Sequence, residues 1–189
     1  TLSLAMLCLL TTQVGALLAQ ESSGTINSST TSASPSLSPL KEYVYAERNF
    51  KIGLPPEWGT RSDHFVPLIS SPKDVLNTGE EFPSVKVAVL PLREGLTLKS
   101  VGDSVAKEYA DFWKIRTDEI QKLGALDVRM MVIDQTLQMT DKKKTHSKMM
   151  KMFVIGKSNY YVITATSKVP TYDDHAPLFK QIMESFQPL

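Results

Sequence analysis

Three segments in the second half of the chain are apolar on both sides of the extended backbone that they are expected to form. They comprise residues 130–133, the methionine-rich stretch 149–153, and residues 160–163. Successive side chains of a strand point to opposite faces of a sheet. A strand with apolar residues on both sides must therefore be covered on both faces. The sequence predicts a sheet that lies between two other layers.

The order of the expected elements indicates what these layers are. Strands are expected at residues 43–54 (two short strands joined by a polar turn at 47–49), 64–70, 84–92, 127–139, 145–155 and 159–167. Residues 71–83 are expected to form a loop, and residues 140–144 the polar tip of a hairpin. Meander-like connections together with separate helices predict an α+β fold, a layered sandwich with a mainly antiparallel sheet.

Residues 97–115 are expected to form the first long helix. Apolar residues recur there at three- and four-residue steps, which places them on one face of a helix of about five turns. They are Leu98, Val101, Val105, Tyr109, Phe112 and Trp113. A stripe of this kind is typical of core packing, so we do not interpret it as a cofactor site.

The first 20 residues are predicted to be an export signal. They contain a short apolar run with small residues, Ala16 and Ala19, at candidate cleavage points. The alternatives are a retained membrane anchor, because a span needs about 20 apolar residues, or a lipid on Cys8, although Leu7 is a poor match to a lipoprotein signal. Removal of this segment leaves a domain without a thiol, which excludes a disulfide framework and a cysteine nucleophile.

Residues 21–40 are rich in serine and threonine and are expected to form a disordered linker. The folded domain is expected to span residues 41–189. All 21 basic residues and 19 of the 20 acidic residues fall in it, which leaves a net charge of +2. Because a nucleic-acid binder needs a clear basic excess, we expect no nucleic-acid partner.

The sequence contains no recognised catalytic motif. His64, His146 and His175 lie far apart and fit no zinc-protease spacing. No G-x-S-x-G elbow and no glycine-rich phosphate loop is present. We therefore expect no catalytic residues, no cofactor and no enzyme activity.

Asp173, Asp174 and His175 form the one cluster that could hold a metal ion or act in acid–base chemistry. Calcium would need more oxygen ligands than two aspartates supply. A helix start explains the same residues, because aspartates there accept free N–H groups, their charge suits the helix dipole, and Pro177 is tolerated in a first turn. Apolar residues at helical spacing follow, namely Phe179, Ile182, Met183 and Phe186.

Two further features are candidates for partner binding. The first is a basic hairpin tip that could contact an acidic partner or an anionic lipid surface, or could simply be a solvated tip that prevents edge pairing. Its residues are Lys142, Lys143, Lys144, His146 and Lys148. The second is Trp58, beside Pro55 and Pro56. An exposed tryptophan there could anchor a partner, whereas a buried one would close the end of the core.

The chain resembles the PsbP-like superfamily. It opens with Phe50, Ile52, Pro55 and Trp58 in an F-x-I-x-x-P-x-x-W pattern, and the strand VKVAVLPL leads into the helix GLTLKSVGDSV. After a long hairpin, an aromatic strand and a final helix end at Ser185-Phe186. The superfamily includes the photosystem II subunit PsbP, a yeast Ran-binding import factor and DcrB-type envelope lipoproteins. The resemblance implies an α-β-α sandwich and a non-enzymatic binding or assembly role, and no metal-related residue of the photosystem subunit matches a position here.

Together these features predict an exported, monomeric binding protein whose partner is a protein or an envelope component. Export would place it in the periplasm, at the cell surface or outside the cell, with possible membrane association through the N-terminus. Two alternatives remain: a lumenal accessory subunit of photosystem II, in a photosynthetic source, and a small-ligand carrier or enzyme that uses a cleft between sheet and helix.

Overall fold

The computed structural model describes residues 39–62, 66–78, 83–108, 110–111, 113–138 and 144–189. The predicted signal segment, nearly all of the predicted linker, and Lys142 and Lys143 of the hairpin tip lie outside these ranges. Within them, the strands form a seven-stranded sheet and a three-stranded sheet.

The seven-stranded sheet has the order β3-β4-β5-β9-β8-β7-β6, and its described pairings are antiparallel. Its strands are β3 (Trp58–Arg61), β4 (Leu68–Pro72), β5 (Ser84–Pro91), β6 (Trp113–Leu123), β7 (Leu126–Gln138), β8 (Lys144–Ile155) and β9 (Asn159–Lys168). The three-stranded sheet has the order β1-β2-β10 and consists of β1 (Lys41–Tyr45), β2 (Phe50–Leu54) and β10 (Gln187–Pro188). The helices are α1 (Lys73–Thr78), α2 (Leu98–Glu108) and α3 (Tyr172–Glu184), with short 3-10 turns η3 (Ala46–Arg48) and η4 (Val169–Thr171).

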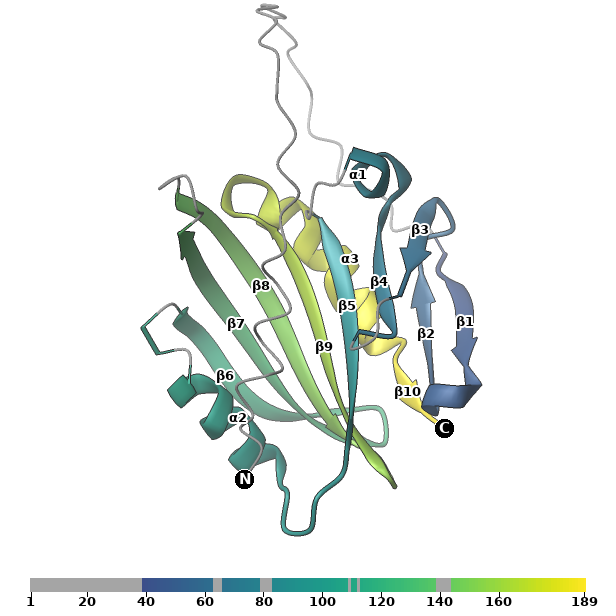
Figure 1. The fold of residues 1–189 in the computed structure, drawn as a ribbon, viewed down its shortest axis with the longest axis vertical. Helices are drawn as coiled ribbons and strands as arrows, with labels where there is room; N and C mark the ends of the chain where they lie inside the picture. The colour runs from purple at the N-terminus through teal and green to yellow at the C-terminus, as the bar shows by residue number, and fades with distance from the viewer. Residues whose placement is uncertain (1–38, 63–65, 79–82, 109, 112, 139–143) are drawn as a thin grey trace, which may run out of the picture.

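Both faces of the central strands of the large sheet are buried, as the apolar runs predict. On β9, Tyr161 and Ile163 belong to one core, while Tyr160 and Val162 belong to the other. The first core also contains Phe50 of β2 and the buried face of α3. The second core contains the buried face of α2. Figure 1 shows α3 running across the large sheet beside the small sheet, and α2 near β6. The predicted fold class, an α+β sandwich around a mainly antiparallel sheet, is therefore confirmed.

The predicted helix at residues 97–115 is too long. The helix ends at Glu108, and Trp113 begins β6. Trp113 nevertheless packs in the same core as Val101 and Val105, so its place in the apolar stripe reflects a shared core and not a shared helix. β6 was missed because its residues after Trp113 are almost all exposed. A strand without a buried face has no apolar alternation in its sequence.

Two smaller predictions also need correction. The segment 71–83 was expected to be a loop, but it contains the short helix α1. Pro177 was expected in a first turn, but α3 begins at Tyr172 and the proline lies in its second turn. This is tolerable because the carbonyl that loses its N–H donor is that of Asp173, whose side chain is 90% exposed.

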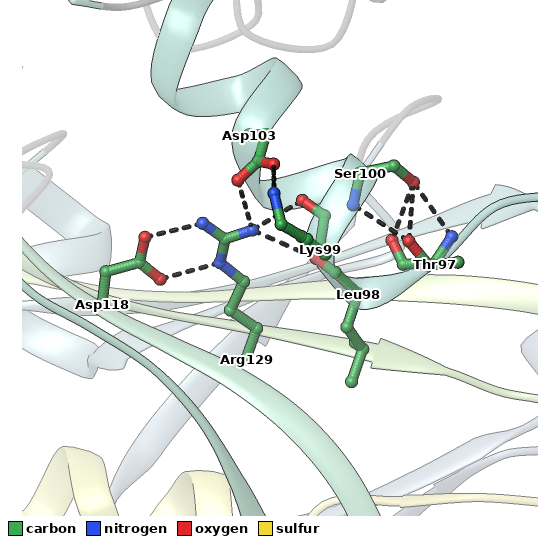
Figure 2. A network of polar contacts seen from close by, with 7 residues as sticks. All are labelled: Thr97, Leu98, Lys99, Ser100, Asp103, Asp118 and Arg129. Atoms are coloured by element: carbon green, nitrogen blue, oxygen red, sulfur yellow. Dashed lines mark hydrogen bonds and ion pairs between the residues drawn. The ribbon is translucent and has the colours of Figure 1, made fainter.

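Reciprocal hydrogen bonds between Thr97 and Ser100 begin α2. The Ser100 N–H donates to Thr97 Oγ1 at 3.1 Å, and the Thr97 N–H donates to Ser100 Oγ at 3.0 Å. This arrangement satisfies N–H groups that have no partner within the helix, as a capping box does. It therefore fixes the residue at which α2 starts (Figure 2).

A buried arginine ties α2 to the sheet. Arg129 of β7 is only 6% exposed. Its Nε and Nη2 atoms donate to the two carboxylate oxygens of Asp118 on β6, at 2.7 and 2.6 Å. Its Nη1 atom donates to the Lys99 carbonyl at 2.6 Å and to Asp103 at 3.0 Å (Figure 2). Hydrogen bonds from Lys99 and then from Arg129 lower the pKa of Asp103. The guanidinium thus joins β6, β7 and α2 in one polar contact, which we call the Arg129 clamp.

Gly102 is the position where the Arg129 clamp restricts the sequence most. A Cβ atom there would overlap the Arg129 guanidinium. In an exposed helix, glycine to alanine stabilises by about 1 kcal/mol. Here we expect the opposite sign: Gly102→Ala should lower the free energy of unfolding by about 1–3 kcal/mol, as overpacking does. Chemical denaturation measures the change, with Ser104→Ala on the exposed side of α2 as the control. A Gly102→Ala variant as stable as the wild type would show that the clamp does not have this geometry.

Candidate functional site

The cluster Asp173-Asp174-His175 does not converge on one point. The His175 Nδ1 atom lies 2.7 Å from the Thr171 carbonyl and 3.0 Å from Ser167 Oγ, and its ring stacks on Phe179. Asp173 contacts Lys148 instead. Among the described residues, no three His, Cys, Asp or Glu side chains are grouped as metal ligands.

The cluster does lie at a helix start, although the aspartates are not the cap. The N-cap residue is Thr171, and it makes no side-chain capping hydrogen bond. Asp173 and Asp174 stand within the first turn. Asp173 and Asp174 therefore do not cap the helix by accepting its free N–H groups. Their negative charge still interacts favourably with the dipole at the helix N-terminus.

Lys148 of the predicted basic tip is held against α3. Its ammonium group lies 4.5 Å from the centroid of the Tyr172 ring and 3.4 Å from the Asp173 carboxylate. His146 is exposed, and its Nδ1 atom lies 3.2 Å from Thr136 Oγ1. His146 also lines a polar hollow of about 450 Å³, together with Asp134 and Lys114 among others. Lys148 is thus engaged by its neighbours, whereas His146 faces solvent.

Trp58, the other candidate for partner binding, is 5% exposed and belongs to the same core as Phe50 and Leu54. A side chain with so little exposed surface cannot anchor a partner in this conformation. The arrangement corresponds to the alternative interpretation, in which the tryptophan closes one end of the core.

An apolar groove with a volume of about 230 Å³ lies between β6 and α3. We call it the β6–α3 groove. Apolar side chains form its floor, three of them methionines: Leu123, Met130, Val132, Met150 and Met183. Polar side chains form its rim: Thr117, Glu119, Gln121, Lys180 and Glu184. It exists because α3 packs mainly against β8 and β9, so no described helix packs closely on the same face of β6.

The rim carries an unbalanced negative charge. Lys180 and Glu184 form an ion pair at 3.7 Å. Glu119 forms no ion pair with another described residue. The groove therefore combines an apolar floor with one uncompensated carboxylate.

The strand beside the groove is the last strand of the sheet. β6 pairs with β7 and has no other neighbour among the described strands. A register shift between Ile115 and Thr117 marks a bulge in its first part. Ile115 and Ile120 are 36% and 56% exposed. Exposed edge strands with apolar side chains are templates for pairing with another chain.

The described residues offer this edge and groove. They include no helix both long and apolar enough to cross a membrane. Sequence reasoning missed the groove because its residues come from four separate elements. The available signal is the charged stretch 114–122 next to Trp113, whose first residues fall within the helix predicted at 97–115.

Comparison with known proteins identifies the fold. No protein-family model and no curated protein sequence matches the chain. Solved structures do: cyanobacterial PsbP (CyanoP) from Synechocystis sp. PCC 6803 covers 85% of this chain and 99% of its own, with a TM-score of 0.58 and 10% identity. The Saccharomyces cerevisiae Ran-binding protein Mog1p covers 81% of this chain and 96% of its own, with a TM-score of 0.51 and 10% identity. Pseudomonas aeruginosa PA94 covers 79% of this chain and 97% of its own, with a TM-score of 0.50 and 10% identity. The chain therefore has the PsbP-like fold that its sequence motifs predicted.

Tyr172, under Lys148, generates a prediction about alkaline pH. Burial, followed by the charges of Asp173 and Asp134, raises its pKa from 10.0 to about 12. Its buried hydroxyl has no hydrogen-bond partner among the described residues. Because the folded state favours the neutral phenol, the stability that Tyr172 contributes is complete below pH 10.0 and is lost as pH rises through about 12.

Tyr172→Phe should therefore leave stability at neutral pH unchanged or higher and should reduce the fall in melting temperature between pH 10.0 and about 12. Tyr43→Phe, at a partly exposed ring, is the control and should retain the full fall. Thermal melts across this pH range measure both variants. A Tyr172→Phe protein with the same alkaline fall as the wild type would contradict the assignment.

Proposed function

We propose that this chain is an exported, non-catalytic binding protein that captures another protein, or a protein component of the envelope, through the β6–α3 groove. The observation that carries the proposal is the groove itself, with its methionine-rich floor beside an unpaired edge strand. Methionine side chains are flexible and polarisable, so they adapt to the shape of a bound apolar group. Mog1p, which shares the fold, is a Ran-binding protein and thus a protein-binding example.

The size of the groove favours a protein partner over a small ligand. Small-molecule sites usually enclose about 300–1,000 Å³, and this groove has about 230 Å³. It therefore suits one or two inserted side chains. A small-ligand carrier is the second candidate function, because the groove is a cleft between sheet and helix of the kind that such a carrier would use.

Filling the groove tests the proposal directly. Gln121→Trp places a large side chain on the rim from an exposed position, so folding should be preserved. In crosslinking pull-downs from the native organism, we expect the wild-type full-length chain to capture its partners. The Gln121→Trp variant should lose most of these partners. Ser104→Trp, exposed on α2, adds the same side chain on the opposite side of the sheet and should retain them. Equal partner recovery by both variants would refute binding through the groove.

The basic tip is a separate binding proposal. Lys142, Lys143, Lys144 and His146 could contact an acidic partner or anionic lipid, whereas Lys148 is committed to Tyr172 and Asp173. Replacing Lys142, Lys143 and Lys144 with Gln should leave the melting temperature unchanged and weaken partner capture, most strongly at low salt. Lys148→Gln should instead lower the melting temperature, because it removes both contacts of that side chain. Unchanged capture by the triple variant would exclude the tip as a binding site.

A further inference from the structure

We propose that the partner presents an extended segment that pairs with β6 as an added strand, places an apolar side chain over the β6–α3 groove, and sets a lysine or arginine beside Glu119. The proposal rests on the proposed function and specifies the form and chemistry of the partner. The main chain, the groove and the charge of the strand support it separately.

The main chain of β6 offers a regular edge. The bulge between Ile115 and Thr117 lies at the start of the strand, and the pairing from Thr117↔Val132 to Leu123↔Leu126 is continuous. Residues 117–123 therefore present their outward N–H and C=O groups at regular spacing. An extended peptide that adds to such an edge gains main-chain hydrogen bonds, while its alternate side chains enter the pockets of one face.

The side chains on this face of β6 leave the groove unfilled. Thr117, Glu119 and Gln121 line its rim, while Met130 and Val132 of β7 lie on its floor. An added strand would lie about 4.8 Å beyond β6. Met130 and Val132 lie on β7, one strand further in, at about 9.6 Å from the added strand, and a flexible methionine can lean across part of that distance. A leucine, methionine or phenylalanine on the added strand can thus extend past the short Thr117 side chain toward the floor.

The charges on β6 determine what the neighbouring side chains should be. Three charged residues are already neutralised within the sheet, through the pairs Arg116–Asp134, Asp118–Arg129 and Lys122–Asp127. Two remain without an ion pair among the described residues, Lys114 before the bulge and Glu119 within the regular stretch 117–123. Opposite charges across neighbouring strands are favourable and like charges are not. The partner segment should therefore carry a lysine or arginine two residues from the apolar side chain that lies over the groove. Both side chains then lie on the groove face of the sheet.

The same charges disfavour a second copy of this chain as the occupant. Antiparallel pairing of two β6 strands centred on residue 118, 119 or 120 would set Thr117, Glu119 or Gln121 opposite Glu119. None of these side chains is a cation, so Glu119 would stay uncompensated. A basic and apolar segment of another protein supplies the missing cation.

Synthetic peptides test the inference against the full-length protein. The probe is a blocked seven-residue peptide in which lysine, leucine and lysine occupy alternate positions between threonines. We expect NMR titration to shift amides of residues 117–123 and methyl groups of Met130 and Met150. The control is the same peptide with N-methyl groups on alternate residues, which keeps the side chains and blocks strand pairing. It should bind at least about ten-fold more weakly, since it cannot make the main-chain hydrogen bonds to β6.

The variant Glu119→Lys tests the charge. The residue is exposed and has no ion pair to lose, so the fold should be unaffected, and binding of the lysine peptide should weaken about five-fold. A peptide with glutamates in place of the lysines should bind the Glu119→Lys variant as tightly as the lysine peptide binds the wild type.

Equal binding of the N-methylated and parent peptides would overturn strand pairing. Absence of peptide binding, with loss of native partners from Gln121→Trp, would overturn this inference and leave the proposed function standing. A concentration-dependent dimer that Glu119→Lys dissociates would show instead that β6 pairs with a second copy.

Discussion

The structure depends on central sheet strands that water cannot reach from either side. The central strands β8 and β9 carry large apolar side chains at successive positions, such as Met152 and Phe153, or Tyr161 and Val162. Neither face can be left to solvent, because each such side chain stabilises the fold by about 1.5–3 kcal/mol when it is buried. The chain meets this requirement with α2 on one face and with α3 and the small sheet on the other. Since these covers are centred on the middle strands, the last strand, β6, is left with an open edge and an unfilled groove.

The Arg129 clamp lies where the buried central strands of the sheet meet the exposed strand β6. Near β6 the second core is closed by a guanidinium that binds Asp118, Asp103 and the first turn of α2, rather than by apolar packing. A buried arginine is tolerable when its donors are satisfied in this way. The clamp also neutralises Asp118 on β6. It thereby leaves Glu119 as the carboxylate that can respond to a partner.

The sequence predicted those parts of the fold whose side chains are buried. The two-sided apolar runs predicted the layered sheet, and the spacing of Phe179, Ile182 and Met183 predicted the last helix. The sequence failed where burial is absent, because an exposed strand such as β6 leaves no hydrophobic period. It also could not separate Val101 from Trp113, which share one core but lie on different elements. The groove was out of reach for a similar reason, since it is formed by tertiary packing of Met130, Met150 and Met183.

The central claim is that the open edge at β6 is the surface on which this fold acts. Hydrogen–deuterium exchange of the full-length chain, alone and bound to a partner captured in its native setting, tests it most directly. The account predicts that bound partner slows exchange at residues 117–123 and leaves the exposed edge strand β1 unchanged. Protection that appears on β1 or on the α2 side of the sheet, with no change at residues 117–123, would contradict the account.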